Sequence, residues 1–368
     1  MKEKSASARI HSDFDCCHRF YSQHGLELSR PGLNFATPVL QSLHNIKPQS
    51  ALKVVAFALL LRTPMAFLPA GKAGELIYNT PFFPELFTRL AGMPLLNNLL
   101  ATLLVTAAAL LLNRICVTQD VIYTNSYLPA WFYILVSSLD PWQYSVHPVM
   151  ISNILILAGF HYLFSLFLYE GPSGLIYLTG VCFGAASVFR IQLVILVVFM
   201  LGAIILMKRI TLRDVLASLL GMAMPIYLLL GIRYVGQVPL RIGSDAVQTG
   251  GMQTEINLLA AIWPMLVVYL LVLFSFAKVA VNYYKNNIRT RRINQVLVFY
   301  TVYQTLVLFL LQGRTIRVDI SLIFAPAAVY VAYLLIGHKY RRYKEAGNLL
   351  LMAVAIAGAY GSTISAIF

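Results

Sequence analysis

The sequence has little charge for its length. Asp, Glu, Lys and Arg make up 11% of its 368 residues, whereas about a quarter of the residues in a soluble domain are charged. Hydrophobic residues reach 59% and the mean hydropathy is +0.74. These values exclude a soluble globular protein and predict that the membrane is the solvent of this chain.

Cysteine and histidine are also scarce. The four cysteines are Cys16, Cys17, Cys116 and Cys182, which have neither the paired spacing of a zinc site nor the pattern of a secreted disulfide framework. No two of the seven histidines stand four residues apart, as two ligands on one helix face would. The sequence therefore predicts no metal site, and the cofactor, if any, is unknown.

The cations of the second half form three clusters between apolar runs. An even number of predicted crossings separates each cluster from the next, so one orientation places all three in the cytoplasm, as the positive-inside rule requires. The net charge of +14 is then explained by helix orientation and anionic headgroups, and nucleic-acid binding is not expected. The clusters are Lys208, Arg209 and Arg213; Lys278, Lys285, Arg289, Arg291 and Arg292; and Lys339, Arg341, Arg342 and Lys344.

Apolar runs of roughly 17 to 25 residues predict an all-α fold, a polytopic transmembrane bundle of about 11 spans with a cytoplasmic N-terminus and a periplasmic C-terminus. The weakest span, 127 to 139, is short and flanked by Pro129 and Pro141, so it could be re-entrant. The spans are expected at 53–70, 94–112, 127–139, 148–169, 173–189, 191–207, 214–232, 257–277, 295–312, 319–337 and 347–366.

Residues 1–50 differ from the membrane domain expected over 51–368. They are polar, mixed in charge and free of any run long enough to span. No apolar core and cleavage site follow the basic residues, so a signal peptide is not predicted. Two explanations of this segment remain open: it is a disordered cytoplasmic tail, or the start codon is assigned too early.

With this topology the outer face carries charges that orientation does not explain. Arg190 stands between two apolar helices, and Arg62 lies deeper within a predicted span. A charge at such depth costs about 2.5 to 3.5 kcal/mol on insertion scales, so a partner or a ligand is expected. The alternative is that Arg62 pairs with Glu75 or Asp140 only to hold helices together.

Several of these positions carry a resemblance. The run from Gly180 to Arg190, with glycine at four-residue spacing and a terminal cation, is similar to the helix pair "GxxxGLAxxxK/R" of the C-type membrane glycosyltransferases. Arg62-Thr63-Pro64 before an outer loop with Glu75, and the segment from Asp140 to Asn153, also resemble that superfamily. The span pattern over 53–340 resembles a family of bacterial polytopic inner-membrane proteins of unknown function. Glycines at this spacing are equally typical of closely packed membrane helices.

The resemblance implies a multi-pass protein of the bacterial inner membrane that transfers a sugar from a polyprenyl-phosphate donor in envelope glycan assembly. Glu75 would be the general base, and Asp140 would be the second catalytic residue. The superfamily usually has Asp where Glu75 stands alone in Ala73-Gly74-Glu75-Leu76. The implied lipid-phosphate-binding residues are Arg62, Arg190, Arg314 and Arg317, because guanidinium groups bind phosphate in a bidentate manner.

Three alternatives remain open. A lipid-linked glycan polymerase or flippase would use the same arginines without a carboxylate base. A transporter would carry ionisable groups in mid-helix, where the sequence offers mainly Asn153, His161 and Gln304 besides Arg62, and no inverted repeat is visible. A noncatalytic subunit of an envelope machine would need none of these groups.

Overall fold

The fold is helical throughout the part of the chain that the structure describes. A computed structural model describes residues 48–63, 87, 89–90, 92–122, 126–167, 173–235, 258–281, 286–310, 320–336 and 341–367, all within one unit, Leu40–Phe368. These residues form 11 α-helices with short 3-10 helices and no strand, which confirms the predicted all-α class. The predicted tail, 1–50, lies almost entirely outside the described residues.

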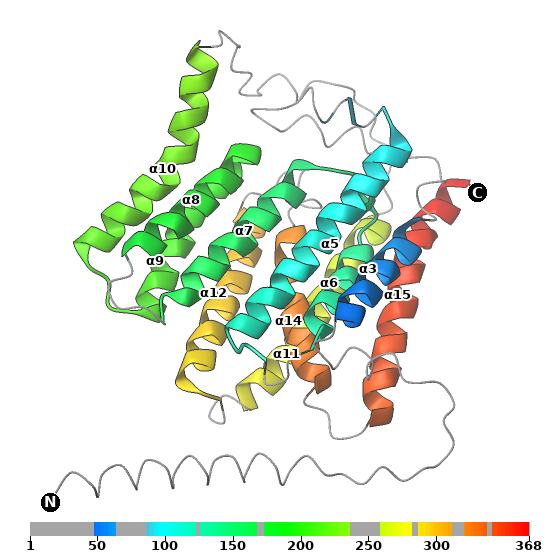
Figure 1. The fold of residues 1–368 in the computed structure, drawn as a ribbon. Coiled ribbons are helices and arrows are strands. Elements are labelled where there is room, and N and C mark those ends of the chain that lie inside the picture. Colours follow the sequence, from blue (N-terminus) through cyan, green and yellow to red (C-terminus); the bar gives the residue numbers. More distant parts are fainter. Residues whose placement is uncertain are drawn as a thin grey trace, which may run out of the picture. The chain divides into compact units, whose positions relative to one another are not determined.

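Each predicted span overlaps one helix (Figure 1). Three described helices, α5, α7 and α10, are long and apolar enough to cross a membrane. The α-helices are α3 (Pro48–Arg62), α5 (Pro94–Thr118), α6 (Leu128–Ser138), α7 (Pro148–Ser165), α8 (Ser173–Phe189), α9 (Leu196–Met207), α10 (Leu212–Val235), α11 (Leu258–Val281), α12 (Ile288–Leu310), α14 (Phe324–Ile336) and α15 (Arg341–Ile367), and the 3-10 helices are η3 (Pro141–Tyr144), η4 (Ile191–Ile195) and η7 (Ile320–Ile323).

Proline defines where several helices begin. Pro94, Pro129 and Pro148 occupy the first turns of α5, α6 and α7. Proline has no N–H to donate and its fixed φ suits the first helical turn, so it starts a helix without losing a hydrogen bond. Pro129, which flanks the weakest predicted span, therefore initiates α6 rather than interrupting it.

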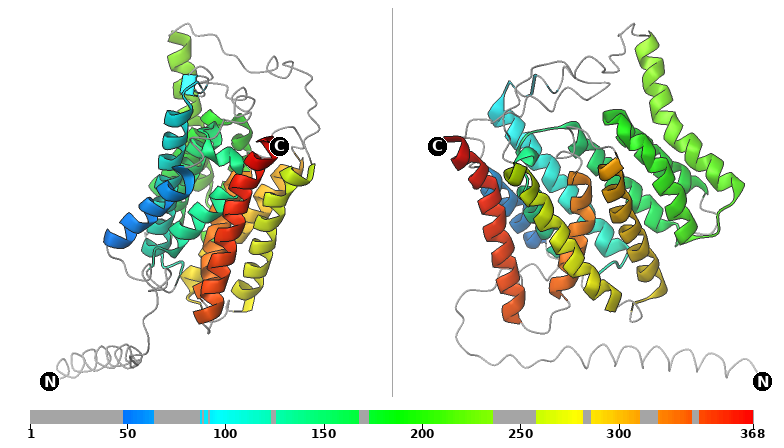
Figure 2. Two further views of the ribbon diagram at one scale, coloured as in Figure 1. Left: turned by 90° about the vertical axis from the view of Figure 1, so that its right-hand side faces the viewer. Right: turned by 180° about the vertical axis from the view of Figure 1, so that it is seen from behind.

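Helix α6 is the central element of the bundle. All of its residues are buried, and it packs against α3, α5, α14 and α15. In the side view of Figure 2, α5 lies on one side of the bundle and α11 and α15 lie on the other. At about 16 Å, α6 is shorter than a hydrocarbon core of about 30 Å, so its apolar composition serves protein packing rather than contact with lipid.

Helices α8 and α10 approach each other closely through glycines (Figure 1). A Cβ added at Gly180 would lie 2.6 Å from the carbonyl oxygen of Ser218, and one at Gly184 would lie 2.3 Å from that of Met222. On the α10 side, a Cβ at Gly221 would lie 2.3 Å from the carbonyl oxygen of Tyr177. The four-residue glycine spacing of α8 thus serves helix packing, as small residues do in membrane bundles.

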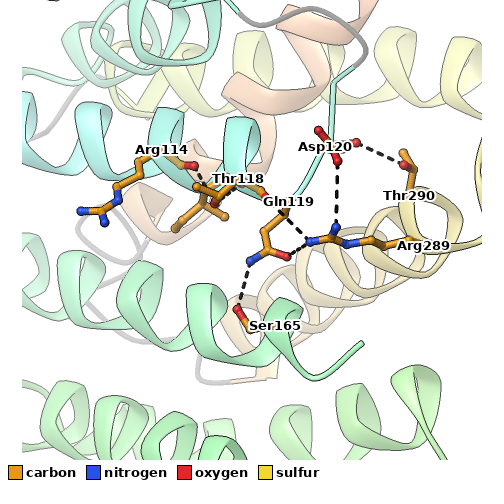
Figure 3. A network of polar contacts seen from close by, with 8 residues as sticks. Arg114, Thr118, Gln119, Asp120, Ser165, Arg289 and Thr290 are labelled. Atoms are coloured by element: carbon orange, nitrogen blue, oxygen red, sulfur yellow. Dashed lines mark hydrogen bonds and ion pairs between the residues drawn. The ribbon is translucent and has the colours of Figure 1, made fainter. Parts of the chain in front are cut away.

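A polar network joins α5, α7 and α12 at the end of the bundle where α5 terminates (Figure 3). The Arg289 guanidinium donates to the Gln119 side chain and pairs with Asp120 at 3.9 Å. Gln119 Nε2 donates to Ser165 Oγ at 3.0 Å, and Thr290 Oγ1 donates to the Asp120 carbonyl at 3.1 Å. We call these five residues the α5-terminal network; it ties helix ends that are far apart in sequence.

The glycine contacts predict a position-specific loss of stability. Gly184→Ala should lower the free energy of unfolding in detergent by about 1 to 3 kcal/mol, because the added methyl group meets the α10 backbone, which cannot rotate away. The matched control is Gly174→Ala on the same helix, where an added Cβ meets nothing within 4 Å. Thermal or denaturant unfolding would measure both variants. Equal stabilities for the two would contradict the packing role.

Candidate functional site

Three helix connections converge at the end of the bundle opposite the α5-terminal network. They are the end of α3, the connection from α6 through η3 to α7, and the connection from α8 to η4. Their charged or ionisable side chains are buried: Arg62 is 0% exposed, His147 2%, Asp140 5% and Arg190 6%. Charged groups are rarely buried unless they are paired or bind something. We call these four residues the outer cluster.

Arg62 ends α3 and projects onto η3. Its Nη2 donates to the backbone carbonyl of Gln143, and its guanidinium carbon lies 4.5 Å from the centroid of the Tyr144 ring. The ring face attracts the cation. Nε and Nη1 have no hydrogen-bond partner among the described residues. Arg62 is therefore held in place on one side while two donors stay open.

The segment that receives Arg62 is itself fixed by hydrogen bonds. The Tyr144 hydroxyl donates to the Ser138 carbonyl at 3.2 Å, and the Gln143 N–H donates to the Asp140 carbonyl at 3.1 Å. Asn97, in the first turn of α5, accepts from the Val146 N–H at 2.8 Å. The connection from α6 to α7 is thus anchored to α5, and Asp140 has a defined position close enough to Arg62 to favour its charge.

His147 precedes α7 and lies within electrostatic range of both arginines. Its Nδ1 donates to the Ser145 carbonyl at 3.1 Å, and its Nε2 lies 3.5 Å from Nε2 of Gln143. The pKa of His147 is lowered to about 4, mainly because the ring is buried. The hydrogen bond to Ser145 raises the pKa, and the positive charges of Arg190 and Arg62 lower it. The imidazole is therefore neutral at pH 7 and adds no positive charge to the outer cluster.

Arg190 is placed by the end of α8. Its N–H donates to the Ala186 carbonyl at 3.3 Å, and the same carbonyl accepts from Ser152 Oγ of α7 at 2.9 Å. The Leu193 N–H donates to the Arg190 carbonyl at 3.0 Å, which turns the chain into η4. The Ala186 carbonyl thus links the end of α8, where Arg190 lies, to α7, and the charge of Arg190 acts on His147.

The composition of the outer cluster favours an anion. The cluster holds two guanidinium groups, one carboxylate and a neutral imidazole. Nε and Nη1 of Arg62 lack acceptors among the described residues, and buried donors without acceptors are costly. A planar guanidinium fork matches the oxygens of a phosphate, so the arrangement is suited to a phosphate group.

Three of the six predicted site residues come together in this cluster: Arg62, Asp140 and Arg190. Glu75, Arg314 and Arg317 lie outside the described residues. Gln143 and Tyr144 were not predicted from the sequence, and only their nearness to Asp140 in the chain could have indicated them. The catalytic and phosphate-binding roles of the six residues stay predictions.

Other features of the described residues give no second candidate. No three His, Cys, Asp or Glu side chains in this part of the chain could hold a metal ion together. A cavity of about 10 Å³ lies among apolar side chains such as Leu157 and Phe160. The cavity has room for about one water molecule, and a bound water needs polar partners, which apolar side chains do not supply. This cavity is therefore not a site for a polar ligand.

Comparison with family models, with curated proteins and with solved structures finds no match to this chain. The residues of the outer cluster and their geometry are therefore the features that indicate a function.

Proposed function

We propose that the chain is a multi-pass protein of the bacterial inner membrane, with about 11 crossings, a cytoplasmic N-terminus and a periplasmic C-terminus. The Arg292 side chain donates to the Leu206 carbonyl at 3.1 Å, so the second cation cluster lies beside the first, which begins at Lys208. Arg289 of the same cluster belongs to the α5-terminal network. Cations gathered at this end support a cytoplasmic assignment for it, and the outer cluster then faces the periplasm.

The proposed activity is transfer of a sugar from a polyprenyl-phosphate carrier by a protein similar to the C-type glycosyltransferases. The observation that carries it is Arg62, a fully buried guanidinium with two open donor nitrogens, in the same cluster as the buried Arg190. Arg62 and Arg190 bind the phosphate, and Arg314 and Arg317, which lie outside the described residues, are proposed to bind it as well.

The reaction needs a base and a stabilised leaving group. Glu75 accepts the proton of the acceptor hydroxyl, whose oxygen forms a bond to the anomeric carbon of the sugar. The bond from that carbon to the phosphate oxygen breaks, and its electron pair leaves with the polyprenyl phosphate. The arginines stabilise the negative charge of the leaving phosphate, and Asp140 orients Arg62.

A second candidate is a lipid-linked glycan polymerase or flippase. It is favoured by the composition of the described cluster, which offers two cations for phosphate but one carboxylate, Asp140, placed beside Arg62. Such a protein would bind the same lipid phosphate without needing Glu75. A transporter-like protein or an envelope-machine subunit would not require the open donors of Arg62.

The topology predicts opposite accessibility for two loops. In a variant without the native cysteines, a cysteine at Ser244 should react with a membrane-impermeant thiol reagent in intact cells, and a cysteine at Lys285 should react only after lysis. The reason is that Lys285 belongs to a cation cluster that stays in the cytoplasm. Labelling of both positions in intact cells would contradict the orientation of the last five spans.

The two candidates predict different effects of Glu75→Gln. In a transferase this variant keeps its size but cannot accept a proton, so product formation should fall about 10²- to 10⁴-fold while lipid binding persists. Arg190→Ala should instead weaken lipid binding, because it removes a charge-assisted contact with phosphate. The assay follows sugar transfer from a polyprenyl-phosphate donor by the purified protein.

The control is Glu85→Gln, which removes another carboxylate from the outer loop expected between the spans 53–70 and 94–112. Full transfer activity in Glu75→Gln would end the role of Glu75 as base. A protein that binds the lipid, transfers nothing and is indifferent to Glu75→Gln would favour the second candidate.

A further inference from the structure

Beside the arginines, the bundle carries an uncharged polar group that helix packing does not fully explain. Asn153 of α7 is 3% exposed. Its Nδ2 donates to the Tyr133 hydroxyl at 2.7 Å and to the Ser321 carbonyl at 3.4 Å, joining α7 to α6 and η7. Its Oδ1 has no hydrogen-bond partner among the described residues.

Tyr133 connects this group to the outer cluster. Helices α3 and α6, which carry Arg62 and Tyr133, are in contact, and the charge of Arg62 acts on the Tyr133 hydroxyl, which accepts from Asn153. The open acceptor of Asn153 and the open donors of Arg62 therefore belong to one neighbourhood.

The chemistry of the open atoms restricts what can bind there. Nε and Nη1 of Arg62 require acceptor oxygens, and an anion supplies them best. Asn153 Oδ1 requires a donor, and its surroundings are neutral, with a phenol and a backbone carbonyl as neighbours. A hydroxyl group satisfies this acceptor without bringing a second charge into a buried site. Together the open atoms fit a phosphate with a hydroxyl-bearing group attached.

We propose that Asn153, oriented by Tyr133, binds a hydroxyl of the sugar in a polyprenyl-phosphosugar and so distinguishes this lipid from the bare polyprenyl phosphate. This inference rests on the proposed function, because the arginines must hold the phosphate for the sugar to reach Asn153. An interhelical hydrogen bond alone would account for Nδ2 but leaves Oδ1 buried without a donor, which is unfavourable.

The test compares the affinities of the purified full chain for two lipids, polyprenyl phosphate and polyprenyl-phosphohexose of the same chain length. The native protein should prefer the sugar-bearing lipid. Asn153→Leu should reduce this preference about two- to tenfold, the value of one neutral hydrogen bond, and leave the affinity for the bare phosphate unchanged. Tyr133→Phe, which retains the ring and removes the hydroxyl that orients Asn153, should reduce the preference in the same direction and serves if Asn153→Leu does not fold.

Asn113→Leu is the matched control. Asn113 is also buried and its Oδ1 also lacks a partner among the described residues, but it lies about 24 Å along α5 from Asn97, towards the α5-terminal network. This variant should leave both affinities unchanged.

Two results would separate the inference from the proposed function. If the native protein binds both lipids equally, or if Asn153→Leu weakens both equally, Asn153 packs helices or binds water, and the inference is wrong while the proposed function stands. If the native protein binds neither lipid, the proposed function fails and the inference fails with it.

Discussion

The buried guanidinium of Arg62 is the constraint around which the end of the bundle that carries the outer cluster is organised. A cation removed from water must recover its lost hydration from the protein or from a ligand. Here η3 supplies the Gln143 carbonyl and the Tyr144 ring, and Asp140 supplies a favourable field. These groups satisfy one of the nitrogen atoms and leave Nε and Nη1 open. The site is therefore built to hold the arginine in place without neutralising it fully.

The rest of the bundle gives this site its rigidity. Aromatic rings of four helices meet in the core: Phe160 lies edge-on to Phe183, Phe199 and Tyr300, with centroid distances of 4.8 to 6.1 Å. Such pairs add to the energy of apolar burial. Together with the glycine contact of α8 and α10, they hold together the helices whose ends carry the outer cluster, and the α5-terminal network joins α5, α7 and α12 at the opposite end.

The helices were predictable from sequence because apolar runs bounded by charge and proline are local signals. The convergence of Arg62, Asp140 and Arg190 was also predictable from sequence. Each predicted crossing reverses the direction of the chain, so every second helix connection is expected at the same face. The partners of Arg62 could not be predicted, because Gln143 lies 81 positions away and contributes a backbone carbonyl, which carries no residue-specific signal. The link from Asn153 to Tyr133 depends in the same way on how α6 and α7 pack. Glu75, Arg314 and Arg317 lie outside the described residues, so their place in the site stays a prediction.

If the outer cluster binds a phosphate through Arg62, the protein must distinguish two lipids that differ only in the phosphate group. Equilibrium binding of polyprenyl phosphate and of the uncharged polyprenol to the purified protein would be measured for the native chain and for Arg62→Met, which keeps a long side chain without the charge. We expect the native protein to prefer the phosphate and Arg62→Met to lose about 10- to 100-fold of that preference, the value of a charged hydrogen bond, with polyprenol binding unchanged. Equal binding of the two lipids by the native protein, or an undiminished preference in Arg62→Met, would contradict phosphate binding through Arg62.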